Sequence, residues 1–507
     1  MFLNEPDVQQ SIERLAAADK LTIIAGAGVS AEAGLPTWPT LVESLLQECA
    51  TVVDSGLTQE EASELVKWIM ETDGLPGSGS VIQSILGDEF IKSLRNCLYG
   101  DPPPVLKPGP TANEIARLFL EAGRGSEVLT TNYDTLLESA LGSRGVPKNR
   151  IRRYIVSKRP PSPDDYVVRH LHGVLTPSEQ QGKTIVLSDA DYYRMQTPGR
   201  WQEVHTKGRL EESSCLFVGT SLSDPNLVRY VYRSEPSDEN IVIFTRQGDD
   251  RATQFLPAVV SARETAARRR WSEGGVLPLY ADYYSEVAQF VYEVSLARRA
   301  LAEGIDYQRF ATRLAEWHAA IGEELLGIED LDDFHRTQDT LQREMTRWLE
   351  GVRDFFEEAD IQPGPNERLG LHVWVLDPAQ YELTLWASSD RAWRDPSTLT
   401  PVRIGLDSPW IAVKAFCRGT PLTEETVDDT SSRWNHVLAV PLRLDAEPED
   451  VLSGEDRWGL LPVGAITLAS TSEPEESSIG SLAAPQRAEL SELLAVVAGN
   501  LLRPAEE

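Results

Sequence analysis

The sequence predicts a doubly wound, parallel α/β sheet over residues 1–298, joined by a helical connector over 299–360 to a smaller α+β domain over 361–507. Two observations predict the first domain. Short apolar runs rich in β-branched residues alternate with stretches of helical periodicity, and several of these runs end in glycine or polar residues. After residue 361, strand-like runs follow one another with turns between them, as in an antiparallel sheet.

Length and charge limit the classes of function. The chain has 507 residues, of which 41% are hydrophobic and 25% charged, as in a globular protein. A chain of this length is too long to fold around one hydrophobic core, so two or three domains are expected. Its formal net charge of −31 disfavours direct binding to nucleic acid, which needs clustered lysine and arginine.

The sequence also indicates where the protein resides and which metal sites it lacks. The sequence contains no apolar run long enough for a membrane span and no secretory pattern in its first residues, so we expect a cytoplasmic protein without membrane contact. The four cysteines form no Cys-x-x-Cys pair, so we expect neither a disulfide framework nor a cysteine zinc site.

The first strand and the turn that follows it carry the main site prediction. A helix over residues 7–20 leads into a buried strand over residues 21–25, and the chain breaks at Gly26 and Gly28 before a helical start at Ser30. Glycines let backbone N–H groups approach an anion, and the positive end of the helix faces the same point. This pattern is typical of a phosphate-binding turn.

The alternation continues to the end of the first domain. Helical patterns form an insertion at about 41–100 that could cover a bound ligand, and consecutive prolines end it. Later strands with their polar ends are expected at 127–134, 167–173, 185–188, 214–221, 240–245 and 276–280, with a closing helix at 284–296. Ligands in parallel α/β sheets bind at the carboxyl ends of the strands, and alternate residues share a face, so we expect Asn132 and Asp134 to point at one ligand.

The remaining chain is predicted to be helical first and then mixed. Residues 301–358 are charged, with apolar positions spaced by three and four, which indicates a connector that packs, with a second copy of the chain as one candidate partner. In the last domain we expect strands at 369–376, 382–387, 401–404, 437–444 and 463–469, and a helix at 486–502.

Four motifs in the first domain resemble those of the sirtuins, in the family's order. The run from Gly26 to Pro36, GAGVSAEAGLP, resembles the first motif, and the segment 131–134, Thr-Asn-Tyr-Asp, resembles the second. His172 followed by glycine resembles the catalytic histidine, and 219–221, Gly-Thr-Ser, resembles the later dinucleotide motif. Its extension over 223–226, Ser-Asp-Pro-Asn, is similar to the sirtuin-like domains of bacterial anti-phage defence proteins.

The resemblance implies a sirtuin/Rossmann-like sheet that takes NAD as its substrate and needs no zinc. The implied catalytic residues are Asn132, which would position water or the ribose, Asp134, which would fix the nicotinamide side, and His172, a general base. The pyrophosphate would lie on the first turn and the adenosine on the Gly-Thr-Ser motif. The implied binding residues are Gly26, Ala27, Gly28, Ser30, Gly34, Pro36, Thr131, Asn132, Asp134, Gly219, Thr220 and Ser221.

Taken alone, each motif has a plainer interpretation. An Asn-x-Asp pair after a strand is usually a helix cap or turn, and Asp224 is expected to cap the helix that follows it. His170 shares a face with His172 and is expected to be structural.

Two departures from the sirtuin pattern bear on the reaction. Sirtuin deacylases carry a four-cysteine zinc module between the histidine and Gly-Thr-Ser motifs, and here this interval holds only Cys215. The family's Asp-Phe-Arg after the first motif is Thr37-Trp38-Pro39 in this chain. Both departures favour hydrolysis of NAD to ADP-ribose and nicotinamide. An NAD-dependent deacylase or ADP-ribosyltransferase, and a non-catalytic sensor of NAD or ADP-ribose, stay as alternatives.

The last domain resembles a GAF domain. The resemblance rests on the runs 373–377, 437–442 and 464–468. It implies a regulatory domain at which a small-molecule or protein trigger acts, and we expect it to control the enzyme through the connector and through assembly into a homo-oligomer.

Overall fold

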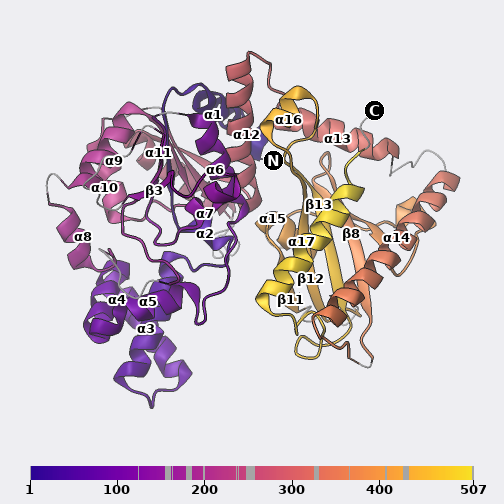
Figure 1. Ribbon diagram of the computed structural model, residues 1–507, viewed down its shortest axis with the longest axis horizontal. Helices are drawn as coiled ribbons and strands as arrows, with labels where there is room; N and C mark the ends of the chain where they lie inside the picture. Colours follow the sequence, from indigo (N-terminus) through magenta and orange to yellow (C-terminus); the bar gives the residue numbers. More distant parts are fainter. Residues whose placement is uncertain are drawn as a thin grey trace.

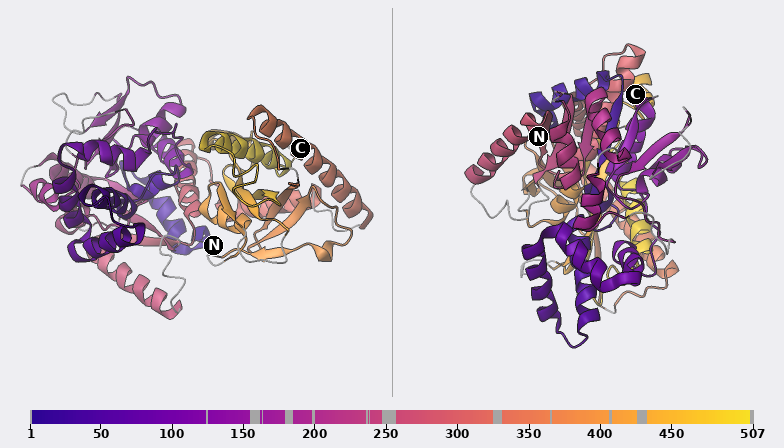
Figure 2. Two further views of the ribbon diagram at one scale, coloured as in Figure 1. Left: turned by 90° about the horizontal axis from the view of Figure 1, so that it is seen from below. Right: turned by 90° about the vertical axis from the view of Figure 1, so that its left-hand side faces the viewer.

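The computed structural model describes residues 2–504 apart from 124, 155–161, 163, 179–184, 198–199, 236, 238, 247–256, 325–330, 365, 406–407 and 426–432. Two sheets lie side by side in this structure (Figure 1). The N-terminal half, indigo to magenta, is α/β, and the C-terminal half, orange to yellow, is built on the second sheet. The left view in Figure 2 shows the same division.

The N-terminal sheet is parallel, as predicted. Within the described residues it has seven strands in the order β3-β4-β2-β1-β5-β6-β7. The strands are β1 (Leu21–Ala25), β2 (Glu127–Thr130), β3 (Ile151–Tyr154), β4 (Tyr166–His170), β5 (Ser214–Val218), β6 (Asn240–Thr245) and β7 (Val276–Ala281). In the central strand, Ile23 pairs with Val128 of β2 on one side and Leu216 of β5 on the other. The loops after β1, β2 and β5 therefore meet at one edge.

Helices cover both faces of this sheet, which confirms the doubly wound prediction. Successive side chains of β1 face opposite sides of the sheet, so Ile23 belongs to the buried cluster on one face and Ile24 to the cluster on the other. The first cluster includes α1 (Pro6–Ala17), α6 (Pro110–Ala122) and α12 (Tyr284–Glu303), and the second includes α9 (Trp201–Glu212), α10 (Pro225–Arg233) and α11 (Pro257–Glu273). Three short helices, α2 (Ala27–Ala31), α7 (Leu136–Ser143) and α8 (Asp189–Met195), follow strand ends or loops.

The helical insertion comprises α3 (Trp38–Val53), α4 (Gln59–Leu86) and α5 (Phe90–Tyr99), which extend from one end of the domain (Figure 1). Helix α4 is kinked at Gly74, where φ is 65° and ψ is 176°. The helix resumes because Pro76 then lies in its first new turn, where a proline N–H is not needed. Between α4 and α5 the chain turns at Gly87, whose φ is 49°.

Two local expectations differ from the structure. Residues 185–188 form no strand, although the Val186 N–H donates to the His172 carbonyl at 3.0 Å. Strand β3 was not expected from the sequence. It lies at the edge of the sheet and carries charged side chains, of which Arg152 forms an ion pair with Asp165.

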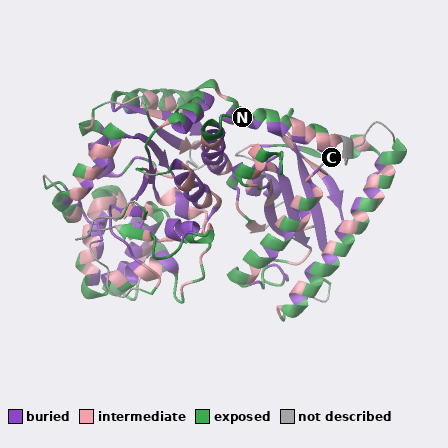
Figure 3. Cartoon of the chain, turned by 45° about the horizontal axis from the view of Figure 1, so that its top comes forward, coloured by how far each residue is buried: buried purple, intermediate pink, exposed green. Residues whose placement is uncertain are grey.

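The C-terminal half is an antiparallel sheet with helices on both faces. Within the described residues the sheet order is β10-β9-β8-β13-β12-β11. Helices α14 and α17 pack against one face and α15 against the other. Figure 3 shows both sheets of the molecule as buried layers beneath helices with exposed outer faces. The strands are β8 (Leu369–Asp377), β9 (Glu382–Ser388), β10 (Pro401–Arg403), β11 (Leu422–Glu425), β12 (His436–Leu444) and β13 (Leu461–Ser470), and the helices are α13 (Phe310–Glu324), α14 (Leu331–Glu358), α15 (Ile411–Arg418), α16 (Pro448–Ser453) and α17 (Ala484–Leu501).

The two halves share a buried junction. Helix α12 packs against α6 and α1 of the first half and against α15 and α16 of the second. Its Gln289 Nε2 donates to the Leu460 carbonyl at 2.6 Å, and its Glu293 pairs with Arg313 of α13, both fully buried. Among the described residues, no helix is both long and apolar enough to cross a bilayer.

Candidate functional site

The turns after β1 and β5 are pressed against each other. Gly26 N–H donates to the Val218 carbonyl at 2.9 Å, and Gly28 N–H donates to the Gly219 carbonyl at 2.8 Å. A Cβ on Gly26 would lie 2.6 Å from the Gly219 oxygen, and one on Gly219 would lie 2.6 Å from Val29 N. Glycine at these positions is therefore required by close approach of the two loops.

The loop after β2 joins this pair through a buried hydrogen-bond network. The Asn132 amide Nδ2 donates to Ser30 Oγ at 2.9 Å and to the Gly26 carbonyl at 3.0 Å. Ser30 Oγ in turn donates to Asp134 Oδ2 at 2.7 Å. All three side chains are more than nine-tenths buried, so three predicted site residues are locked together.

Asp134 uses its two carboxylate oxygens for different hydrogen bonds. Its Oδ1 accepts the Leu136 N–H at 3.0 Å, which caps the start of α7 as the plain interpretation of the motif expects. Burial raises the pKa of Asp134, opposed by the hydrogen bond from Ser30. The Asn132 Oδ1 atom is buried and accepts no hydrogen bond from the described residues.

His170 is structural, in agreement with expectation. Its Nδ1 lies 2.9 Å from the Asn132 carbonyl and its Nε2 lies 3.1 Å from Glu138 Oε1, so the ring braces the Asn132 loop from behind. The side chain is fully buried. Burial lowers the pKa of His170, but the Glu138 carboxylate outweighs it and the net shift is upward.

His172 lies beside the loop that follows Ser221. Its Nε2 is 3.2 Å from Asp224 Oδ2, and its ring meets the Tyr192 ring edge-on at a centroid distance of 5.5 Å. Tyr192 OH donates to the same Asp224 oxygen at 2.8 Å. Burial lowers the pKa of His172, although Asp224 opposes the shift, so the imidazole is neutral at pH 7.

The remaining predicted residues lie around these groups. Thr131 donates its N–H to the Ala25 carbonyl at 3.3 Å, which joins the β2 loop to the β1 loop. Thr220 Oγ1 accepts the Leu222 N–H at 3.2 Å, and exposed Ser221 bonds Ser223 at 2.7 Å between their hydroxyls. Ala27 and Pro36 are half-buried and Gly34 is exposed with φ 85°.

Tyr192 was not predicted from the sequence, and Asp224 was predicted only as a helix cap. Asp224 does cap α10, because its Oδ1 accepts the N–H groups of Asn226 and Leu227 at 3.0 and 2.8 Å. The signal for Asp224 was its place three residues after the Gly-Thr-Ser motif. The sequence around Tyr192 carries no such signal, because α8 reaches the site only through tertiary packing.

The structure describes no metal centre at this site. No group of three or more His, Cys, Asp or Glu side chains that could hold a metal ion occurs in the part of the chain that is described. Cys215, in β5, is fully buried.

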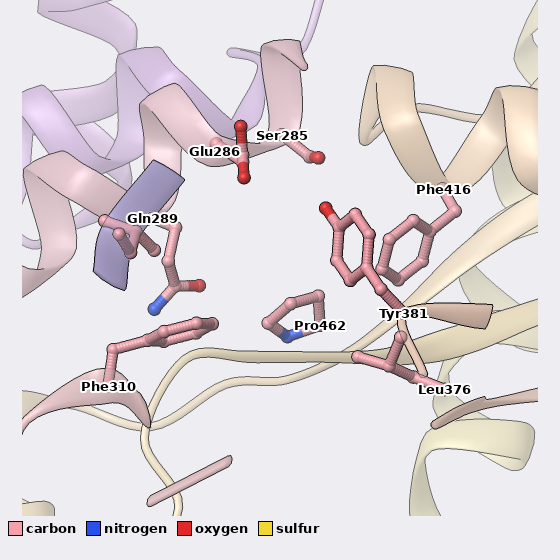
Figure 4. Close-up of a pocket in the computed structure, with 9 residues that line it drawn as sticks. Ser285, Glu286, Gln289, Phe310, Leu376, Tyr381, Phe416 and Pro462 are labelled. Atoms are coloured by element: carbon pink, nitrogen blue, oxygen red, sulfur yellow. The ribbon is translucent and has the colours of Figure 1, made fainter. Parts of the chain in front are cut away.

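A separate cavity lies at the junction of the two halves. It is lined by Glu286 and Gln289 of α12, by Tyr381, and by apolar side chains from both halves (Figure 4). Its volume of about 20 Å³ holds one water molecule, because a water needs roughly 10–15 Å³ of such space. This cavity is too small for a nucleotide.

Comparisons with known proteins find one family model and several relatives that match part of this chain. Residues 126–269 match the model of the SIR2-like domain. A protein named NAD(+) hydrolase ThsA from Enterococcus faecium is 28% identical over 212 residues, which cover 41% of this chain and 38% of the relative. A protein of the same name from Bacillus cereus (strain MSX-D12) is 30% identical over 220 residues, with coverage of 41% and 38%.

This chain therefore matches about two fifths of the length of these curated relatives. Among solved structures, a Sir2 homologue in complex with NAD matches 58% of this chain and 94% of its own, with 14% identity and a TM-score of 0.31.

Proposed function

We propose that this chain is an NAD+ glycohydrolase that cleaves NAD to ADP-ribose and nicotinamide and acts in anti-phage defence. The observation that supports the proposal is that Ser30, Asn132 and Asp134 bond one another, while His172 and Asp224 pair after strands that end at the same edge of the parallel sheet. Asn132, Asp134, His172 and Asp224 lie within the residues that match the SIR2-like domain, and the similarity of this chain to proteins named NAD(+) hydrolase supports NAD as the substrate.

The side chains at the site have chemistry suited to this cleavage. Rupture of the nicotinamide–ribose bond passes through an oxocarbenium-like state, in which the bonding electrons leave with the nicotinamide nitrogen. The Asn132 Oδ1 acceptor could hold a water molecule or a ribose hydroxyl against the cationic carbon. As the water oxygen bonds to that carbon, neutral His172 would accept the water proton and later release it to solvent.

The resting site is closed by its own hydrogen bonds. Ser30, Asn132, Asp134 and His172 are each exposed by 8% or less, and three of them bond one another. NAD must exchange these contacts for its own, so we propose that activity depends on a change that opens the site.

We further propose that the C-terminal, GAF-like domain controls this change. Glu447, which precedes α16, accepts a hydrogen bond from Arg117 of α6 at 3.1 Å and one from Arg144, which caps the end of α7, at 2.9 Å. Helix α7 begins at Leu136, whose N–H donates to Asp134, so these contacts hold a helix that starts beside the site. A small-molecule or protein trigger, and assembly into a homo-oligomer, would act through these contacts.

The test is product analysis on the purified full chain. Incubation with NAD alone should release nicotinamide and ADP-ribose in equal amounts, more strongly once a trigger is found among candidate nucleotides. Nicotinamide release that requires an acyl-lysine peptide, or ADP-ribose that stays attached to protein, would favour the deacylase or transferase alternatives. Saturable NAD binding without turnover under every condition would favour the sensor.

A further inference from the structure

The Asp224 carboxylate is held so that its two oxygens have separate tasks. Oδ1 accepts the N–H groups of Asn226 and Leu227 and is thereby fixed to the start of α10. Oδ2 turns toward the site, where it lies 3.2 Å from His172 Nε2 and accepts the Tyr192 hydroxyl at 2.8 Å. Asp224 is 8% exposed and Tyr192 is 4% exposed, so water does not screen these contacts.

We propose that Asp224 and Tyr192 are positioning residues for His172. Asp224 Oδ2 keeps the proton of the neutral imidazole on Nε2, which leaves Nδ1 to accept a proton. The Tyr192 hydroxyl donates to the same oxygen and so weakens the interaction of Asp224 with the ring. This role deepens the proposed function, because it concerns the same general base. It follows from geometry, since a carboxylate beside one ring nitrogen favours the tautomer that carries its proton there.

Tyr192 is fixed independently of His172 by the contacts of its helix. The Ser188 hydroxyl caps α8 by accepting the Asp191 N–H at 3.3 Å, and Asp191 Oδ2 accepts Gln83 Nε2 of α4 at 2.9 Å. The helical insertion therefore determines where the Tyr192 hydroxyl lies. A ligand that moves α4 would change how Asp224 is shared.

The titratable groups that influence this pair come from three elements. Asp224 opposes the effect of burial on the pKa of His172. Burial raises the pKa of Tyr192 far above its ordinary value, and Asp224, Tyr133 and Asp191 raise it further. Tyr192 thus stays protonated at every working pH and can only donate to Asp224.

The proposal makes opposite predictions for two conservative variants. Asp224→Asn keeps the helix cap but removes the charge beside Nε2, so His172 should protonate at lower pH and lose its fixed tautomer. Tyr192→Phe frees Oδ2 for His172 alone, so the imidazolium gains stability and His172 should protonate at higher pH. A general base works only when unprotonated, so the acidic limb of the pH profile should move down for Asp224→Asn and up for Tyr192→Phe.

The experiment measures kcat and KM for NAD from pH 5 to 9 for the full chain and both variants. We expect Asp224→Asn to lose about tenfold or more in kcat at pH 8. For Tyr192→Phe, we expect the ratio of kcat at pH 6 to kcat at pH 8 to be lower than in the unmodified chain by about twofold or more. The control is Tyr99→Phe, which removes a buried hydroxyl that donates to the Leu175 carbonyl at 2.6 Å and should leave the limb in place.

The proposal would be overturned if the acidic limbs of Asp224→Asn and Tyr192→Phe moved in the same direction. It would also be overturned if both limbs coincided with the limb of Tyr99→Phe. If the unmodified chain does not hydrolyse NAD, the proposed function fails, but the positioning role is still tested by ¹⁵N NMR of histidine-labelled protein, with His172 assigned by comparison with His172→Gln. A proton on Nε2 in the unmodified chain, lost from that position in Asp224→Asn, supports the role. A proton on Nδ1 in the unmodified chain contradicts it.

Discussion

Gly28 donates its backbone N–H to the carbonyl of Gly219 at 2.8 Å, so the turn after β1 and the turn after β5 are in direct contact. These turns lie about 190 residues apart in the sequence, and adjacent pairing of β1 with β5 brings them together. The turn that leads to Ser30 and the Gly-Thr-Ser motif therefore lie side by side.

Gly219→Ala should separate these turns. Gly219 has φ 64°, and its new Cβ would lie 2.6 Å from Val29 N, so both backbone strain and a clash oppose the substitution. We expect a loss of about 2 kcal/mol or more in the free energy of unfolding, and loss of NAD hydrolysis. The matched control is Gly304→Ala, where φ is 69° but the space is open, and which should lose only the strain contribution. Equal losses in the two variants would contradict close packing of the turns.

Arg117→Ala should destabilise the contact between the two halves. Arg117 is 4% exposed in its side chain and bonds Glu114 at 2.6 Å as well as Glu447. Its removal leaves the buried Glu114 carboxylate with only a longer contact to Arg144, at 3.9 Å. Removing one partner of a buried ion pair typically costs about 3–5 kcal/mol. Glu447→Gln, at a half-exposed position, should cost about 1 kcal/mol or less in urea denaturation.

The Glu447→Gln variant also tests whether this contact controls NAD hydrolysis. If Glu447 restrains α6 and α7, Glu447→Gln should raise NAD hydrolysis in the absence of a trigger while the protein stays folded. Unchanged resting activity would remove Glu447 from the proposed control.

Glu127→Gln should show a stability loss that depends on pH. His205, Arg169 and Arg209 all contact Glu127, and although burial opposes them they lower its pKa from 4.5 to about 2. Because the unfolded chain binds this proton at higher pH than the folded protein, the stabilisation is complete above 4.5 and is lost as the pH falls toward 2. A shift of this size corresponds to about 3 kcal/mol.

Urea denaturation of Glu127→Gln and the unmodified chain at pH 7 and pH 4 tests this. The difference in unfolding free energy should be smaller at pH 4. A difference that is equal at the two pH values would contradict the assignment.

Much of this arrangement could be predicted from residue patterns, for physical reasons. The strand that ends at Ala25 is buried on both faces, so its apolar run and the glycines after it identify it locally. Asn132 and His172 could be expected at the same edge because parallel strands share one direction. The antiparallel second domain was likewise indicated by adjacent strand-like runs.

Other parts depend on tertiary packing and could not be read from local patterns. Ile185 and Leu187 read as a strand, but they are buried against the helical insertion rather than in the sheet. The edge strand β3 contains Arg152 and Arg153 and so lacks the apolar run by which a buried strand is predicted from sequence. Tyr192 reaches Asp224 only because α4 holds α8 in place.

The most direct test of the central claim is nicotinamide release by the full chain and by Asn132→Ala and His172→Ala, each shown to be folded by its thermal unfolding. If one site formed by separate strand ends hydrolyses NAD, both variants should lose about 10²-fold or more in kcat while keeping a cooperative unfolding transition. Undiminished release of nicotinamide by both folded variants would contradict it.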